Sequence, residues 1–255
     1  MEENRNERSR RRLVVGDIHG CSRTFRALLE DEVEIRRGDD LYLLGDLVSK
    51  GPDSIGVLRY VENLEERGIN VSIIRGNHEE AILRARDEGK GRLREILERT
   101  RNTSLLEPKR GKALDPRWER LFERSVYVAS LPDAILVHGG VDLTRNEPYA
   151  DGAAIVNARE TVYDEERAAQ RPVIHGHTRA PLSEIIERLV AGASILPLDN
   201  GAVAASNHNP FKVSEYGNLC CLDLDRWSLH IQPNRDVIDD SSIPGAFSIR
   251  IHVSR

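Results

Sequence analysis

The stretch VSIIRGNHEE, residues 71–80, shows the structural pattern that repeats along this chain. Its apolar run Val71–Ile74 predicts a buried strand. Gly76 follows and permits a tight turn, which delivers the polar side chains of Asn77 and His78. A helical pattern then begins. The stretch therefore predicts a strand, a glycine turn and a helix, which is the repeating unit of a layered α/β fold.

Four other apolar runs are followed by a turn of the same kind. The runs are Leu13–Val15, Leu41–Leu44, Ala134–Val137 and Val173–Ile174, and the turns read GDIHG (16–20), GD (45–46), HGG (138–140) and HGHT (175–178). Ligands bind at the ends of strands in layered α/β sheets. We therefore expect the polar side chains of all five turns to gather at one edge of the sheets.

The remaining sequence alternates between helical and strand-like patterns. Helices are expected over residues 24–30 and 53–67, a broken helical stretch over 79–125, and a loop followed by a helix over 141–170. After residue 180 the pattern changes to β, with strand candidates at 184–190, 195–203, 219–224 and 227–232.

The five turns together carry two Asp, one Asn and at least four His. Imidazole and carboxylate groups suit a pair of divalent metals such as Mn, Fe or Zn, and the absence of cysteine from these turns disfavours a structural thiolate zinc site. A single such motif more often marks an ordinary turn or a structural histidine. However, five of the eight histidines lie in these turns, namely His19, His78, His138, His175 and His177. Chance clustering is therefore a poor explanation.

These motifs resemble, in sequence and in order, the calcineurin-like metallophosphoesterases and their phosphoprotein-phosphatase-like branch. The resemblance spans residues 13 to about 203; IRGNHE (74–79) is similar to the signature of Ser/Thr protein phosphatases and DNGA (199–202) to the closing strand and turn. It implies an α/β (α+β) fold, a two-sheet αββα sandwich with a helical insert over the site. It also implies a cofactor of two divalent ions, with manganese first and Fe, Zn, Co or Mg as alternatives.

The resemblance also implies a role for each site residue. Asp17 and His19 would bind one metal, Asn77, His138 and His177 the other, and Asp46 would bridge both. His78 would be the general acid, Arg159 resembles an arginine that clamps the substrate phosphate, and His175 is interpreted as structural. Two metals roughly 3.5 to 4 Å apart lower the pKa of a bridging water, so that a metal-activated hydroxide attacks phosphorus in line.

The stretch GDLVSKGP, residues 45–52, departs from the protein-phosphatase pattern. Those enzymes usually carry Asp-Arg in place of Ser49-Lys50, and there the Asp orients the general-acid histidine while the Arg grips phosphate. Loss of the Asp should lower the pKa of His78 and weaken acid catalysis. That loss matters less for a departing phosphate, with a second pKa of about 6, than for a serine alkoxide. The Lys-Gly-Pro ending is similar to the ApaH-like phosphatases, relatives of symmetrical diadenosine tetraphosphate hydrolases, and Lys50 is expected to contact substrate.

Three functions follow from these residues. The first is hydrolysis of phosphoanhydrides in nucleoside polyphosphates of the diadenosine tetraphosphate type or in polyphosphate, with capped RNA ends as a related substrate. The second is a Ser/Thr protein phosphatase, in which case Ser49-Lys50 is a neutral substitution. The third is a silent metal-binding module, which we disfavour because every ligand position is present.

Length and composition agree with one globular domain. The 255 residues carry 37 basic and 42 acidic side chains, which argues against whole-surface binding of nucleic acid. We expect a flexible Arg-rich tail at 1–12, a metallophosphoesterase domain at 13–235 with a basic helical insert at 80–125, and an extension at 236–255 that adds an edge strand or an oligomer contact. The basic excess of the insert is either a lid for a polyanion or a solvated helical face. Three cysteines and no long apolar run predict a cytoplasmic protein without membrane contact.

Overall fold

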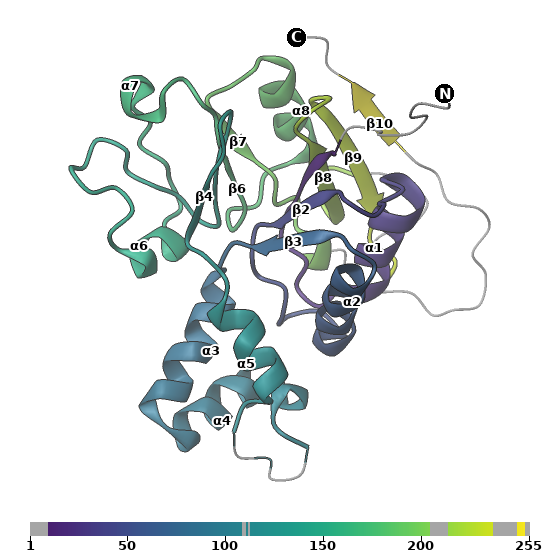
Figure 1. Ribbon diagram of the computed structural model, residues 1–255, viewed down its shortest axis with the longest axis vertical. Helices are drawn as coiled ribbons and strands as arrows, with labels where there is room; N and C mark the ends of the chain where they lie inside the picture. Colours follow the sequence, from purple (N-terminus) through teal and green to yellow (C-terminus); the bar gives the residue numbers. More distant parts are fainter. Residues whose placement is uncertain (1–9, 109–110, 112, 205–213, 237–248, 253–255) are drawn as a thin grey trace, which may run out of the picture.

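The strands form two sheets, which lie face to face in the computed structural model (Figure 1). The structure describes residues 10–108, 111, 113–204, 214–236 and 249–252. The first sheet has the order β10-β9-β8-β1-β2-β3 and the second the order β4-β5-β6-β7. The first comprises β1 (Arg12–Val15), β2 (Asp40–Leu43), β3 (Asn70–Ile73), β8 (Asn218–Asp223), β9 (Ser228–Pro233) and β10 (Ile249–His252). The second comprises β4 (Val128–Ser130), β5 (Ile135–Val137), β6 (Val173–His175) and β7 (Ile195–Pro197).

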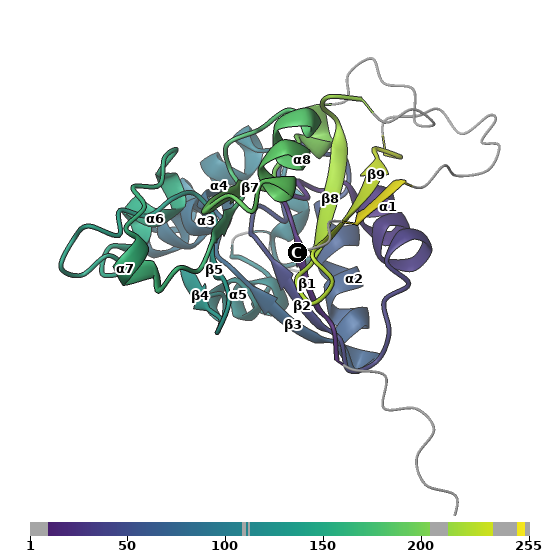
Figure 2. The ribbon, with the colours of Figure 1, turned by 90° about the horizontal axis from the view of Figure 1, so that it is seen from above.

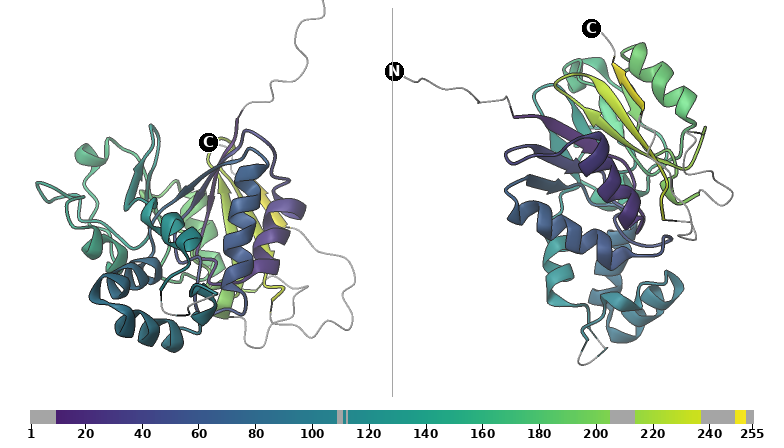
Figure 3. Two further views of the ribbon diagram at one scale, coloured as in Figure 1. Left: turned by 60° about the horizontal axis from the view of Figure 1, so that its bottom comes forward. Right: turned by 90° about the vertical axis from the view of Figure 1, so that its right-hand side faces the viewer.

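Helices cover the outer face of each sheet, which gives the expected αββα order of layers (Figure 2). On the first sheet lie α1 (Ser22–Ala27), which continues into a π-helical turn at Leu28–Glu32, and α2 (Ser54–Glu66). These helices pack side by side (Figure 3, left). The second sheet is covered by α6 (Gly152–Asn157) and α7 (Glu165–Ala168). The predicted two-sheet fold is confirmed.

The alternation of side chains along the strands explains why the apolar runs are continuous. Leu13 and Val15 pack toward α1 and α2. Val14, between them, packs into the core between the two sheets. All three side chains are fully buried. A strand that is covered on both faces needs apolar residues at every position. β1, β2 and β3 pair in parallel, and so do β5, β6 and β7, which directs their carboxyl ends toward a common edge.

The segment after residue 76 forms a separate group of helices below the sheets in Figure 1. It contains α3 (Asn77–Glu88), α4 (Lys90–Arg99), a short 3-10 turn at Thr103–Leu105 and α5 (Pro116–Glu123). Gly89 adopts a φ of 115° between α3 and α4, which agrees with the broken helical pattern expected over 79–125. None of the described helices has the length and apolarity needed to cross a membrane.

Two strand predictions after residue 180 were wrong. The segment predicted as a strand at 184–190 is the helix α8 (Leu182–Val190), and the strand predicted at 195–203 ends at Pro197, before a 3-10 turn at Ala202–Ala204. Leu182, Ile185 and Leu189 are buried on one side of α8. Their spacing of three and four residues is helical, and it outweighs the β propensity of the paired isoleucines.

The ends of the chain also differ from expectation. The predicted tail at 1–12 ends earlier, because Arg12 begins β1 and Arg11 is buried; residues 1–9 lie outside the described residues. At the other end, β10 pairs antiparallel with β9, so the extension adds an edge strand.

Arg11 is held in place by a buried ion pair. Its guanidinium lies 2.6 Å from the Asp39 carboxylate and donates to the carbonyl oxygens of Val33 and Glu34. Removal of Arg11 leaves the buried Asp39 carboxylate with one longer ion pair among the described residues, to Arg36 Nε at 3.7 Å, so we expect Arg11→Ala to lower the free energy of unfolding by about 3 kcal/mol, the low end for a broken buried pair. Denaturant unfolding measures the change.

Arg10→Ala is the matched control. The Arg10 side chain is 62% exposed and pairs with Asp40 at the surface, so its loss should change stability by less than about 1 kcal/mol. Equal stabilities of the two variants would show that the Arg11 pair contributes no more than a surface contact.

Candidate metal centre

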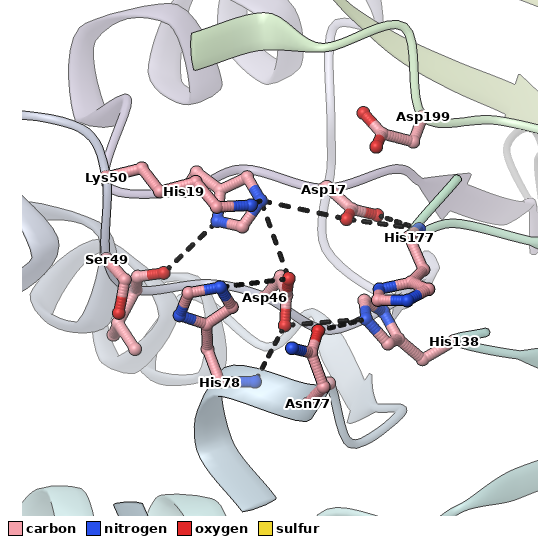
Figure 4. A network of polar contacts seen from close by, with 12 residues as sticks. Asp17, His19, Asp46, Ser49, Lys50, Asn77, His78, His138, His177 and Asp199 are labelled. Atoms are coloured by element: carbon pink, nitrogen blue, oxygen red, sulfur yellow. Dashed lines mark hydrogen bonds and ion pairs between the residues drawn. The ribbon is translucent and has the colours of Figure 1, made fainter. Parts of the chain in front are cut away.

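The five predicted turns meet at one edge of the two sheets (Figure 4). Each side chain follows from the end of a strand of the parallel core, and a third carboxylate, beside those of Asp17 and Asp46, comes from the segment after β7. The residues are Asp17 and His19 after β1, Asp46 after β2, Asn77 and His78 after β3, His138 after β5, His177 after β6, and Asp199 after β7.

Close backbone contacts explain the glycines of these turns. A Cβ atom on Gly76 would lie 2.2 Å from the Asp46 nitrogen, and one on Gly45 would lie 2.5 Å from the Gly76 nitrogen. His19, Asp46 and His177 adopt φ values of 49°, 47° and 62°, in the left-handed region that such residues rarely occupy. Backbone strain of this kind concentrates at functional sites.

The Asp46 carboxylate lies between two groups of ligand atoms. One group contains His19, Asp46 and His78, the other contains Asp46, His138 and His177, and within each group the atoms lie within 4.8 Å of one another. Asp46 Oδ2 is 3.4 Å from His19 Nε2, and Asp46 Oδ1 is 3.4 Å from His138 Nε2. The two oxygens of one carboxylate thus face two different groups, which is the geometry that a bridging ligand requires.

Backbone carbonyls fix the orientation of two of the imidazoles. His138 Nδ1 lies 2.6 Å from the carbonyl oxygen of Leu44, and His19 Nδ1 lies 3.3 Å from that of Val48. A carbonyl oxygen only accepts, so Nδ1 carries the proton in both rings and Nε2 keeps its lone pair. Both Nε2 atoms face Asp46, as is usual for metal-binding histidines held by a backbone carbonyl.

The donor set around Asn77 is one that a divalent cation fits. The end of the Asn77 amide lies 3.2 and 3.1 Å from the two carboxylate oxygens of Asp46, 3.1 Å from His138 Nε2 and 3.2 Å from His177 Nδ1. With its NH₂ group on this side, the amide donates to these acceptors; with its oxygen on this side, it adds a further donor atom for a cation. The mixed oxygen and nitrogen donors of the cluster suit borderline divalent metals.

Burial without a compensating charge shifts the pKa values in the cluster. Burial raises the pKa of Asp46 to about 7, and it also raises the pKa values of Asp17 and Asp199. Burial lowers the pKa values of His138 and His177 to about 4. Metal ions would stabilise the carboxylates in their ionised form.

Lys50 and Asp17 occupy different parts of the cluster. Lys50 Nζ lies 2.7 Å from His19 Nε2, so its ammonium group points into the acidic site. The Asp17 carboxylate accepts from the backbone N–H of His177 at 3.1 Å and lies 3.9 Å from His19 Nε2. It belongs to neither of the two ligand groups by distance.

Ser49 is buried and turned toward the helical segment. Its hydroxyl accepts a hydrogen bond of 2.6 Å from Asn102, and Asn102 also accepts from Ser54 at 2.7 Å. Ser49 and Lys50 have φ values of 75° and 67°, so this contact holds two successive left-handed residues.

Among the described residues, the carboxylate beside His78 is that of Asp46, with Oδ2 at 3.8 Å from His78 Nε2. Burial and Lys50 lower the pKa of His78 to about 3, in the direction expected from the loss of an Asp at position 49.

An open cavity of about 350 Å³ lies over the cluster and contains both predicted substrate residues. Lys50 and Arg159 line it together with His19, Asn77 and His177. Arg179 and Asp199 also line it, although sequence reasoning assigned them no role. The sequence signal for Arg179 was its position after the HGHT segment, and that for Asp199 was the DNGA motif, which resembles the closing strand and turn of the family.

Glu79 is a third residue without a predicted role. It is fully buried, and its carboxylate accepts from the backbone N–H groups of Asp46, Leu47 and Gly76 at 2.9, 2.9 and 3.1 Å. It thereby joins the turn after β2 to the turn after β3. The only sequence feature that could have drawn attention to Glu79 was its position next to His78 in the stretch 71–80.

The helical segment 80–125 does not contribute to this cavity among the described residues. Its arginines largely pair with neighbouring acids: Arg86 with Glu119 and Glu123, and Arg94 with Glu98. These contacts favour a solvated helical face over a basic lid.

Comparison with known proteins gives a family match over most of the chain. The model of the family described as "Calcineurin-like phosphoesterase" matches residues 10–206. The chain is 39% identical over 89 residues to the "Bis(5'-nucleosyl)-tetraphosphatase, symmetrical" of Proteus mirabilis, covering 33% of this chain and 32% of that protein. It is 47% identical over 70 residues to the protein of the same name in Photorhabdus laumondii, covering 28% and 24%. The matched part therefore spans about a third or less of these relatives.

Two crystal structures are similar in fold to the whole chain. One is provisionally described as a diadenosine tetraphosphatase, with a TM-score of 0.58 and 19% identity over 98% of this chain and 96% of that chain. The other is a cold-active protein-tyrosine phosphatase of a Shewanella species, with a TM-score of 0.56 and 16% identity over 87% and 77%.

Proposed function

The chain belongs to the calcineurin-like phosphoesterase family, and from this premise we propose that it hydrolyses phosphoanhydride bonds of nucleoside polyphosphates with two divalent metal ions. The arrangement that supports the metal pair is Asp46, whose two carboxylate oxygens face separate groups of imidazoles. Manganese is our first candidate, with Fe, Zn, Co and Mg as alternatives.

We assign the ligands from the family resemblance and from their positions around Asp46. Asp17 and His19 would hold one ion, although Asp17 lies outside both ligand groups by distance, and Asn77, His138 and His177 would hold the other. Asp46 would be shared by the two ions. When bound, such a pair supplies Lewis acidity and a nucleophile derived from water at neutral pH.

The side chains around the metals bind and orient the phosphoryl group. Lys50, Arg159 and Arg179 line the cavity and place cationic donors beside the phosphoryl oxygens. His78 is assigned the transfer of a proton to the leaving oxygen. Glu79 holds the Asp46 turn through backbone N–H groups and is a positioning residue.

The surroundings of Ser49 and His78 support our proposal that anhydrides are preferred over phosphoserine. Its hydroxyl is engaged by Asn102, and no described carboxylate other than Asp46 lies near His78 to orient it and raise its pKa. Protonation of a serine alkoxide would therefore be weak, whereas a departing phosphate needs little protonation. The names of the curated relatives, symmetrical tetraphosphatases, agree with this preference.

We also propose a cytoplasmic location, because Cys21, Cys220 and Cys221 are free and buried. The boundaries of the domain at 13–235, its insert at 80–125 and the extension at 236–255 likewise remain proposals.

A comparison of substrates tests the function. The purified protein is assayed with Mn, Co, Zn and Mg against diadenosine tetraphosphate, inorganic polyphosphate and a phosphoserine peptide. We expect kcat/KM for the dinucleotide to exceed that for the peptide at least about a hundredfold, because a phosphate leaves without strong acid catalysis. If the peptide is the best substrate, the protein is a Ser/Thr phosphatase and Ser49-Lys50 is neutral.

A further inference from the structure

A second cavity opens beside the metal cluster. Its volume is about 330 Å³, within the range of about 300–1,000 Å³ that is typical of small-molecule sites. It lies between the loop after α6, the end of β6, the helix α8 and the strand β7, and α8 and β7 pack together in Figure 2. Arg159 and Arg179 line both this cavity and the catalytic one. The two cavities therefore adjoin at these two arginines.

The two shared arginines are available to a ligand. Neither guanidinium makes an ion pair or a side-chain hydrogen bond with another residue in the described part of the chain. Most other arginines of the fold have such partners, for example Arg86 with Glu119 and Arg188 with Glu184. An unengaged guanidinium binds phosphate through two parallel hydrogen bonds. The junction between the cavities is thus suited to phosphate groups.

Beyond the junction the chemistry of the lining changes. Glu160 and Glu184 place carboxylates in the wall, and Ala180, Ile195 and Pro197 make it partly apolar. Arg188 also lines this part, but it is bound to Glu184 at 2.8 Å and donates to the carbonyl oxygen of Ile195. Its charge is therefore compensated.

His175 adds an acceptor to the same wall. Its Nδ1 lies 3.0 Å from the carbonyl oxygen of Gly176, so the proton resides on Nδ1 and Nε2 is left for a ligand. The ring lines the cavity, although the sequence suggested only a structural role. The Glu160 carboxylate, which pairs with no described cation, and the imidazole acceptor repel phosphate but receive hydrogen bonds from hydroxyl and amino groups, whereas Glu184 is already paired with Arg188.

We propose that the second cavity is a nucleoside subsite: Arg159 and Arg179 bind phosphates at its entrance, and the wall of Glu160, His175, Glu184 and Ile195 receives the ribose and base. The proposal rests on the proposed function and deepens it. It predicts that the enzyme selects substrates whose phosphate chain ends in a nucleoside, and that it discriminates against inorganic polyphosphate.

The test measures the ratio of kcat/KM for diadenosine tetraphosphate to kcat/KM for tripolyphosphate. Ile195→Trp fills the cavity, and Glu160→Lys replaces a carboxylate at an exposed position with a cation that attracts phosphate. We expect each variant to lower the ratio at least tenfold. Val190→Trp and Glu187→Lys are matched controls, because both residues are exposed on α8 and neither lines the cavity; they should keep the ratio within twofold.

Binding measurements separate a failure of the subsite from a failure of the proposed function. AMP and pyrophosphate are titrated by calorimetry into the metal-free protein and its variants. If the subsite exists, Ile195→Trp should raise the dissociation constant of AMP at least tenfold and that of pyrophosphate less than threefold. This result would support the subsite whether or not the wild type hydrolyses these anhydrides. If the wild type hydrolysed neither of them, the proposed function would be wrong but the subsite would stand. An unchanged ratio in both cavity variants, or equal weakening of AMP and pyrophosphate, would overturn the subsite.

Discussion

Replacement of Asp46 by asparagine is expected to remove at least one metal ion and to lower kcat/KM about a thousandfold. The variant replaces one carboxylate oxygen with an amide NH₂ group, which cannot coordinate a cation and faces either His19 or His138. The Lewis acidity of a metal site is worth several kcal/mol of transition-state stabilisation, and about 4 kcal/mol corresponds to a thousandfold change in rate. Metal content by mass spectrometry and steady-state kinetics measure the two effects.

Asp87→Asn is the matched control for this change. Asp87 lies on α3, close in sequence to the site, but its side chain is 68% exposed. This variant should keep both the metal content and the activity. A chelator should inactivate the wild type, and Mn²⁺ should restore it. If Asp46→Asn retained two metal ions per chain and full activity, the bridging role would be wrong.

The gathering of these polar side chains could be predicted because its signals are local in the sequence. Each proposed ligand follows a buried strand within a few residues, as Asp46 follows β2 and His138 follows β5. Parallel pairing of the strands is then sufficient to bring these strand ends to the same edge of the sheet. A strand-end pattern of this kind therefore predicts the composition of a site and its place in the fold.

The contacts that tune the site could not be predicted, because they join distant parts of the chain. Ser49 meets Asn102, which lies 53 positions away, and nothing in either local sequence indicates the contact. Arg159 and Arg179 share two cavities only because the loop after α6 lies against the end of β6. Such pairs depend on tertiary packing, which short-range patterns do not encode.

The same limit explains an error in secondary structure and an alternative left open for charge. The helix α8 was assigned to a strand because its β-branched residues were given more weight than the spacing of Leu182, Ile185 and Leu189. The basic excess of 80–125 left a lid and a solvated helical face as alternatives, because a count of charges does not show pairing. In the structure, Arg86 and Arg94 bind acids of the same segment.

Replacement of His78 by alanine is expected to have an effect that depends on the leaving group. The backbone N–H of residue 78 donates to Asp46 Oδ1 at 3.0 Å, and alanine preserves this contact, so the metal cluster should persist. For phenyl phosphate, whose leaving group has a pKa of about 10, loss of the imidazole should lower kcat about 10²-fold, at the low end of general-acid catalysis because the pKa of His78 lies far below neutral pH. For diadenosine tetraphosphate the loss should stay below about tenfold, because the departing phosphate has a second pKa of about 6.

The environment of His78 makes this contrast a sharp test of its role. Because burial and Lys50 hold its pKa near 3, the imidazole is rarely protonated at neutral pH, so an enzyme that relied on it would be slow with basic leaving groups. His78 also lies within the group of ligand atoms that contains His19 and Asp46, which suggests the opposing outcome. If His78→Ala loses metal and kcat falls by the same factor for both substrates, His78 is a ligand and the proton must come from water. Retained metal with a large loss on phenyl phosphate alone assigns the proton transfer to His78 and explains why anhydrides, which need no strong acid, suit this site.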